Sequence, residues 1–175
     1  RLNMIDTPGR VDFVGKAIAS LPAVETMMLV LDPSVGIDPV ARRLMKVSGE
    51  RNLPRAIIIN KLDSGEKLDE LLASIQETFG SACRPINLPS DGGKSVIRCF
   101  KSGEGESDLG PVADFHTGLV DQVVEVDEAL MEQYLEQGEV TPEQLEEPFK
   151  RAMREGHLVP VLFTSAREGT GVAEL

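Results

Sequence analysis

Cysteine is scarce in this sequence of 175 residues. Cys83 and Cys99 lie in unrelated contexts and form no CxxC pair, which excludes a disulfide framework and a zinc knuckle and is typical of a reducing compartment. We therefore expect a cytoplasmic protein with two unpaired cysteines. Long apolar runs are also lacking: residues 27–31 and 57–59 fall far short of the roughly 18 residues that a membrane span needs. We expect no membrane partner.

Positive charge is the second shortage. The chain has 18 Lys and Arg against 29 Asp and Glu, a net charge of −11, so bare phosphate backbones repel it and we expect no DNA partner. His116 and His157 lack any metal-ligand spacing and are interpreted as ordinary polar residues. An initiator methionine is missing too, and an apolar run is already under way by residue 4. We expect an interior segment of a longer protein.

Strand and helix patterns alternate in the first 80 residues. Strands are expected at 2–5, 26–31 and 55–60, and a helix with apolar residues at helical spacing at 11–21. Asp38 and Pro39 predict the cap and first residue of a helix over 39–49, and Ser64 is expected to cap the next helix. A last strand is expected at 158–164. This alternation predicts a parallel α/β sheet.

The regular pattern is interrupted after residue 82. From 83 to about 118 the chain is rich in Gly, Ser, Pro and Asp, with a weak strand at 95–100 and a hairpin tip at 101–107. Two acidic helices are expected at about 125–137 and 142–155, the second with a capping box that begins at Thr141. We therefore divide the chain into a core at 1–82, an inserted subdomain at 83–157 and a return to the core at 158–175.

Three short motifs follow three of the expected strands, and the carboxyl ends of parallel strands are where ligands bind in open sheets. The first is Asp6-Thr7-Pro8-Gly9. Its carboxylate suits a water on a nucleotide-bound Mg²⁺, and its glycine N–H can approach a terminal phosphate. Taken alone, the motif is weak evidence, and an ordinary turn at the end of a strand is the better interpretation of it.

The second motif, Asn60-Lys61-Leu62-Asp63, follows a run of isoleucines. A carboxylate can accept from the two adjacent N–H donors of guanine, an Asn amide can brace the loop and meet a ring acceptor, and a Lys stem can lie over the base. The third motif, Ser165-Ala166, could aim a backbone N–H at the guanine oxygen.

A phosphate-cradling loop, G-x-x-x-x-G-K-[ST], is missing. The only Gly-Lys-Ser is Gly93-Lys94-Ser95, where Leu88 occupies the position of the first glycine. Gly103-Glu104-Gly105 fails as a dinucleotide fingerprint, because Asp108 occupies the position of the third glycine. We interpret both as chance matches.

Together these residues resemble the GTP-binding domain of translational GTPases, and more narrowly elongation factor G and its relatives. Residues 6–13 resemble the third G motif and second switch of that family, 60–63 its fourth motif and 165–166 its fifth. Residues 85–89, 126–136 and 159–163 resemble the flanks of its added subdomain. The 102 positions from Asp63 to Ser165 leave room for that subdomain, since one strand-helix-strand step needs only about 30 residues.

The resemblance implies a P-loop NTPase-type, Rossmann-like G domain with an inserted α+β subdomain, truncated at its N-terminus so that the P-loop and first switch are lacking. It implies Mg²⁺ with GTP or GDP in the intact protein, Asp6 acting on the metal through water, and none bound to this fragment. Gly9 and Arg10 take the catalytic positions, although the family typically has histidine where Arg10 stands, and arginine cannot act as a base. The implied nucleotide-binding residues are Asp6, Thr7, Pro8, Gly9, Asn60, Lys61, Asp63, Ser165 and Ala166.

The leading hypothesis is a GTPase that acts on the ribosome in protein synthesis and contacts the large-subunit stalk and rRNA through the full-length protein. A degenerate G domain that binds the ribosome or another partner without hydrolysis is the alternative, and an unrelated α/β enzyme with chance motifs is the third. Translocation, recycling and ribosomal protection stay open. The glutamates of the two acidic helices are either a solvated face or a docking surface.

Overall fold

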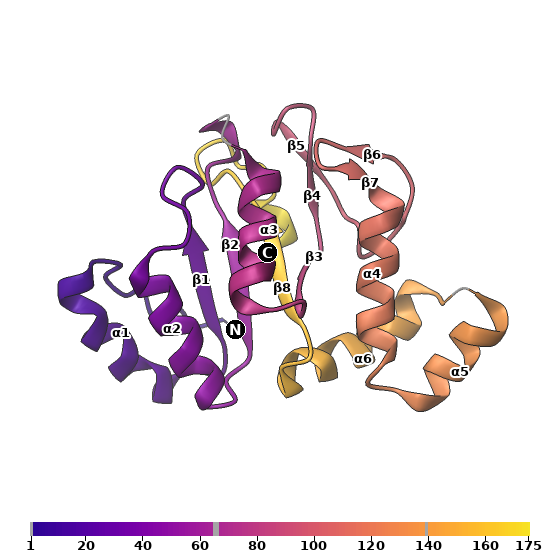
Figure 1. Cartoon of the computed structure of the whole chain (residues 1–175), viewed down its shortest axis with the longest axis horizontal. Helices are drawn as coiled ribbons and strands as arrows, with labels where there is room; N and C mark the ends of the chain where they lie inside the picture. The colour runs from indigo at the N-terminus through magenta and orange to yellow at the C-terminus, as the bar shows by residue number, and fades with distance from the viewer. Residues whose placement is uncertain (1, 65–66, 139) are drawn as a thin grey trace.

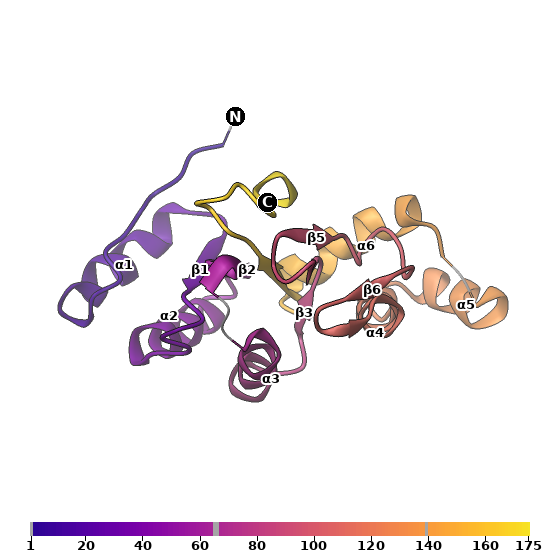
Figure 2. The ribbon, with the colours of Figure 1, turned by 90° about the horizontal axis from the view of Figure 1, so that it is seen from above.

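A parallel sheet of four strands forms the centre of the computed structural model, which describes residues 2–64, 67–138 and 140–175. The strands lie in the order β1 (Met27–Leu31), β2 (Arg55–Ile59), β8 (Val159–Phe163) and β3 (Cys83–Pro85) (Figure 1). Helices α2 (Pro39–Glu50) and α3 (Leu68–Phe79) lie on one side of these strands (Figure 2). The predicted α/β class with a parallel sheet is confirmed.

The burial of the strands explains their composition. Ile57 and Ile59 in β2 are completely buried, and every residue of β8 is buried, as apolar strands in the middle of a covered sheet should be. β1 alternates instead: Met28 and Val30 are 52% and 59% exposed on one face. β1 is therefore covered on one face only.

Helix α2 confirms the prediction made from its first residues. The Asp38 carboxylate accepts a hydrogen bond from Ala41 N at 2.7 Å, and Pro39 is the first helical residue. By contrast, the helix expected at 11–21 is divided into a 3₁₀ turn, η1 (Val11–Phe13), the short α1 (Val14–Ser20) and a second 3₁₀ turn, η2 (Leu21–Ala23).

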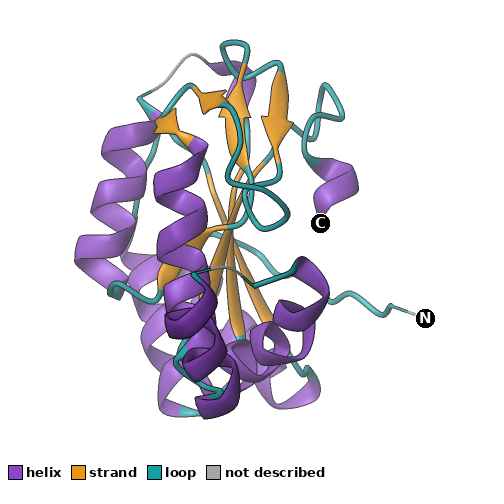
Figure 3. Cartoon of the chain, turned by 90° about the vertical axis from the view of Figure 1, so that its right-hand side faces the viewer, coloured by secondary structure: helices purple, strands orange, loops and turns teal. Residues whose placement is uncertain are grey.

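The strand predicted at residues 2–5 is wrong. These residues continue as a loop that runs away from the sheet (Figure 3), and Leu2 and Met4 are 82% and 83% exposed. A strand is stabilised by a hydrogen-bonded neighbour, and β1 pairs only with β2 among the residues that the structure describes. The apolar pattern alone cannot form a strand without that partner.

The cap predicted at Ser64 is also wrong. Ser64 ends a 3₁₀ turn, η3 (Leu62–Ser64), and its N–H donates to Lys61 O at 2.9 Å, whereas α3 begins at Leu68 with Lys67 as its cap residue. Ser64 therefore belongs to the 3₁₀ turn that follows β2 and is not the cap of α3.

The segment between β3 and β8 contains two small hairpins and three helices. β4 (Leu88–Ser90) pairs with β5 (Ser95–Ile97), and β6 (Glu106–Ser107) with β7 (Gly110–Pro111). The weak strand predicted at 95–100 thus ends at Ile97, and residues 106–107 of the predicted hairpin tip are part of a strand pair. α5 (Glu128–Gln137) and the capping box of α6 (Pro142–Glu155) follow.

Helix α4 (Val112–Val124) was not predicted. Pro111 and Gly118 made this stretch look like a loop, but its buried residues fall at helical spacing and could have identified it: Val112, Leu119, Val120, Val123 and Val124. α5 begins three residues later than expected because α4 continues to 124, and the Asp127 carboxylate then caps α5 by accepting from Leu130 N at 3.1 Å.

These helices have their own hydrophobic cluster, which includes Leu119, Leu130 and Leu145 and is separate from the cluster around the sheet. Both cysteines are buried and free, and burial raises the pKa of Cys83 to about 11 and of Cys99 to about 12. Over the described ranges, no three His, Cys, Asp or Glu side chains gather as a metal site requires, and no helix is long and apolar enough to cross a membrane.

Candidate functional site

Three strands of the sheet end at the same level. Leu31 lies beside Ile59, and Ile59 lies beside Phe163, so the residues that follow these strands emerge at one edge, at the top of Figure 1. Asp32, Asn60 and Thr164 are those residues. The structure therefore brings the second and third predicted motifs together.

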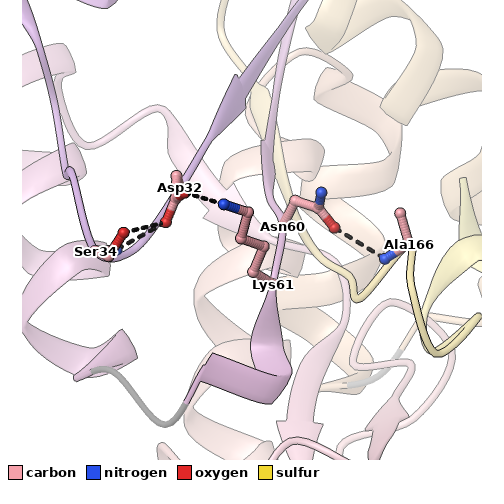
Figure 4. A network of polar contacts seen from close by, with 5 residues as sticks. All are labelled: Asp32, Ser34, Asn60, Lys61 and Ala166. Atoms are coloured by element: carbon pink, nitrogen blue, oxygen red, sulfur yellow. Dashed lines mark hydrogen bonds and ion pairs between the residues drawn. The ribbon is translucent and has the colours of Figure 1, made fainter.

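Asn60 connects the two loops. Its Oδ1 accepts hydrogen bonds from Ala166 N at 2.9 Å (Figure 4) and from Thr164 Oγ1 at 3.3 Å. The backbone adds a further link, since Leu62 N donates to Thr164 O at 3.1 Å. Through these contacts Asn60 links the loop after β2 to the loop after β8, and the Ala166 N–H is already used in a hydrogen bond to Asn60 Oδ1.

Asp63 is held by the loop after β8. Ser165 is buried, and its Oγ donates to Asp63 Oδ1 at 2.5 Å, while the carboxylate itself is exposed. This hydrogen bond is the main reason that the pKa of Asp63 lies below its ordinary value. The site thus presents an oriented, ionised carboxylate, which can only accept hydrogen bonds.

Lys61 points along the edge toward β1. Its backbone is left-handed, with φ of 70°, and its Nζ pairs with the Asp32 carboxylate (Figure 4). Asp32 also accepts from Ser34 N at 3.0 Å and Ser34 Oγ at 2.7 Å, and these contacts, Lys61 first, lower its pKa to about 2. The ion pair holds the lysine stem across the open edge.

Asp32 was missed as a site residue. The sequence showed Asp32 and Pro33 only as the end of a strand, and the carboxylate directly after that strand was the one usable signal. The pairing of β1 with β2 supplies the missing link.

The first motif stays apart from this network. Residues 6–10 lie in the extended N-terminal stretch, where all but Thr7 are exposed, and the Arg10 guanidinium pairs with Asp12 at 3.6 Å. Among the described hydrogen bonds and ion pairs, none joins residues 6–10 to the loops after β2 and β8. Gly93 and Lys94 lie in the turn of the β4–β5 hairpin and Ser95 begins β5, whereas a phosphate loop would lie between a strand and a helix.

Comparison with known proteins gives a consistent result. The family model of the Elongation factor Tu GTP binding domain matches residues 1–175. The chain is 29% identical, over 189 aligned residues, to an elongation factor G-like protein from two strains of Mycobacterium tuberculosis, CDC 1551 / Oshkosh and ATCC 25618 / H37Rv. That alignment covers all of this chain and 26% of the relative, so the chain spans about a quarter of its length.

A solved structure from Thermus thermophilus has the same fold. It superimposes with a TM-score of 0.82 at 34% sequence identity, over 97% of this chain and 28% of the other. The match of the family model over the whole chain, together with the parallel sheet, places the chain in the Elongation factor Tu GTP binding domain family.

Proposed function

We propose that this chain is the guanine-recognising part of an elongation factor G-like translational GTPase, which binds GTP and GDP and hydrolyses GTP on the ribosome during protein synthesis. The observation that carries the proposal is the pair of cross-links Asn60–Ala166 and Asp63–Ser165 at the level ends of β2 and β8. Family membership and the resemblance of the chain to elongation factor G-like proteins support the ribosomal setting.

The arrangement fits the chemistry of guanine. The ionised Asp63 carboxylate can accept from the ring N–H and the exocyclic amine, whereas adenine offers no such donor pair. Asn60 Oδ1 is occupied by Ala166, so its amide nitrogen is the group that would face a ring acceptor. The guanine oxygen would share the Ala166 N–H with Asn60 in a three-centre hydrogen bond.

Mg²⁺ is implied by the family, and Asp6 is the residue for it. Asp6 offers a single exposed carboxylate on an extended segment. One carboxylate cannot surround a Mg²⁺ ion, but it can contact the ion through a metal-bound water. Mg²⁺ on nucleotide phosphates usually keeps several waters and uses only one or two protein carboxylates. When bound, the ion would neutralise charge that develops on the phosphates. Gly9 would offer its N–H to the terminal phosphate.

Arg10 separates the GTPase from the alternative, a degenerate G domain that binds the ribosome or a partner without hydrolysis. A guanidinium stays charged and cannot accept a proton from water, although it can stabilise developing negative charge. Arg10 is exposed and near its neighbour Asp12.

The test is GTP turnover by the full-length protein, with and without ribosomes, for the native sequence and for Arg10→His. Turnover by the native protein that ribosomes stimulate supports the GTPase. The degenerate module is supported if the native protein binds GDP but does not turn over GTP, and if Arg10→His restores GTP turnover. No preference for GDP over ADP would contradict both. For the isolated chain we expect no hydrolysis and weak or absent nucleotide binding.

A further inference from the structure

The turn between β4 and β5 packs directly behind the loop that follows β2. Gly93 is buried with φ of 79°, and a Cβ atom at this residue would lie 2.7 Å from Leu62 O and 3.3 Å from the Leu62 carbonyl carbon. Leu62 stands between Lys61 and Asp63, and its side chain is buried. The two backbones therefore approach as closely as they do only because residue 93 has no side chain.

The same turn holds the loop that follows β8. Thr170 Oγ1 donates to Lys94 O at 3.2 Å, and Thr170 O accepts from Ser165 N at 2.8 Å. Just beyond β5, Arg98 Nη2 lies 2.9 Å from Glu174 Oε1. One hairpin thus contacts both loops of the candidate site, and Figure 1 shows it rising at the same end of the sheet.

Asp108 sets the shape of the turn. Its two carboxylate oxygens accept from Gly92 N at 3.1 Å and Gly93 N at 2.9 Å, while its own N–H donates to Pro89 O at 2.9 Å. Asp91, Gly92 and Gly93 all have positive φ, so successive N–H groups converge on the carboxylate. The turn is built around one anion that the chain itself supplies.

We propose that the turn at 91–94 is a positioning element for guanine recognition: it supports Leu62 from behind and tethers Thr170, and so keeps Asp63 and Ala166 in their places. The effect of the turn on nucleotide affinity rests on the proposed function. Its effect on how well the loops after β2 and β8 are ordered does not. By linkage, a bound nucleotide would in turn stabilise the hairpin, which couples the segment between β3 and β8 to the nucleotide.

The exchange of backbone amides in the 175-residue chain tests the ordering of the loops. Gly93→Ala is compared with Gly92→Ala, because both residues have positive φ but only a Cβ at residue 93 meets Leu62. We expect amides in 60–63 and 164–170 to exchange about tenfold faster in Gly93→Ala than in Gly92→Ala, with β1 unchanged in both. Equal exchange in the two variants would overturn the proposal.

The binding of GDP to the full-length protein tests the consequence for the nucleotide. We expect Gly93→Ala to bind GDP about tenfold more weakly than Gly92→Ala and to discriminate less against inosine diphosphate, which lacks the exocyclic amine that Asp63 would accept from. Thr170→Val, which removes one hydrogen bond and adds no bulk, should shift both readouts in the same direction, and it decides the matter if Gly93→Ala does not fold.

The two measurements separate the possible failures. A native protein that binds no GDP would refute the proposed function, and the amide exchange would still decide whether the turn orders the loops. A native protein that binds GDP, with unchanged affinity and discrimination in Gly93→Ala and Thr170→Val, would overturn the positioning role and leave the proposed function in place.

Discussion

Asn87 extends the edge of the sheet with a side chain. Backbone pairing between β3 and β8 ends at Pro85 and Val161, and Ile86 N adds one more bond, to Val161 O. Asn87 is 1% exposed; its Nδ2 donates to Phe163 O at 3.0 Å, and its Oδ1 accepts from Phe163 N at 2.7 Å. The amide thus satisfies the last residue of β8 as a neighbouring strand would.

Asn87→Ala should therefore destabilise the chain strongly. Phe163 is completely buried, so the substitution leaves a buried N–H and a buried C=O without partners. Each unsatisfied group costs about 1–3 kcal/mol, so the free energy of unfolding should fall by about 2–6 kcal/mol. Phe163 directly precedes Thr164 and Ser165, so the two lost hydrogen bonds lie next to the residues of the candidate site.

Urea denaturation followed by far-ultraviolet circular dichroism measures this free energy. Asn3→Ala is the matched control, because Asn3 is exposed in the N-terminal stretch, and it should change stability by less than about 0.5 kcal/mol. A loss below about 1 kcal/mol for Asn87→Ala, with an unchanged dependence on urea, would refute the view that these two bonds hold the end of β8.

Three further predictions concern charge. Asp63→Asn in the full-length protein should weaken GDP binding about 100-fold, because a charge-assisted acceptor for two donors is lost; an unchanged dissociation constant would argue against Asp63 as the base-reading group. The folded-state pKa of Asp32 is about 2 against an ordinary 3.8, so its pairing stabilises the fold above pH 3.8 and this contribution disappears as the pH falls through 2; acid titration of Asp32→Asn should show a shallower loss of stability in that window. Glu132→Lys with Glu136→Lys should reduce ribosome-stimulated GTP turnover if the acidic helices dock a partner, and unchanged turnover would identify a solvated face.

Elements with their own local signals were predictable from the sequence. The isoleucines of β2, the Asp38 cap of α2 and the capping box at Thr141 each specify their element within a few residues. Helix α4 was missed because Pro111 and Gly118 are turn residues in most contexts. For residues 2–5 the prediction erred in the other direction, by expecting a strand where none forms. These residues have the composition of a strand, but among the described residues they have no neighbouring strand to pair with.

The candidate site divides in a similar way. The motifs after β2 and β8 were recognisable because each consists of particular side chains at a fixed, short spacing directly after a strand. The residues that hold them were not: Asn87 and Asp108 act on partners 76 and 15 residues away, and Asp32 meets Lys61 across a strand pair. No short window of sequence contains both partners.

By itself, the sequence determined the α/β class, the positions of β2 and β8, the motifs that make up the candidate site and the family the chain resembles, because these depend on local composition and spacing. Only the tertiary structure decided that β1, β2 and β8 end at one level, that Lys61 pairs with Asp32, and that a glycine turn supports Leu62. Those facts arise from strand register and close backbone packing, which come into being only when distant segments meet.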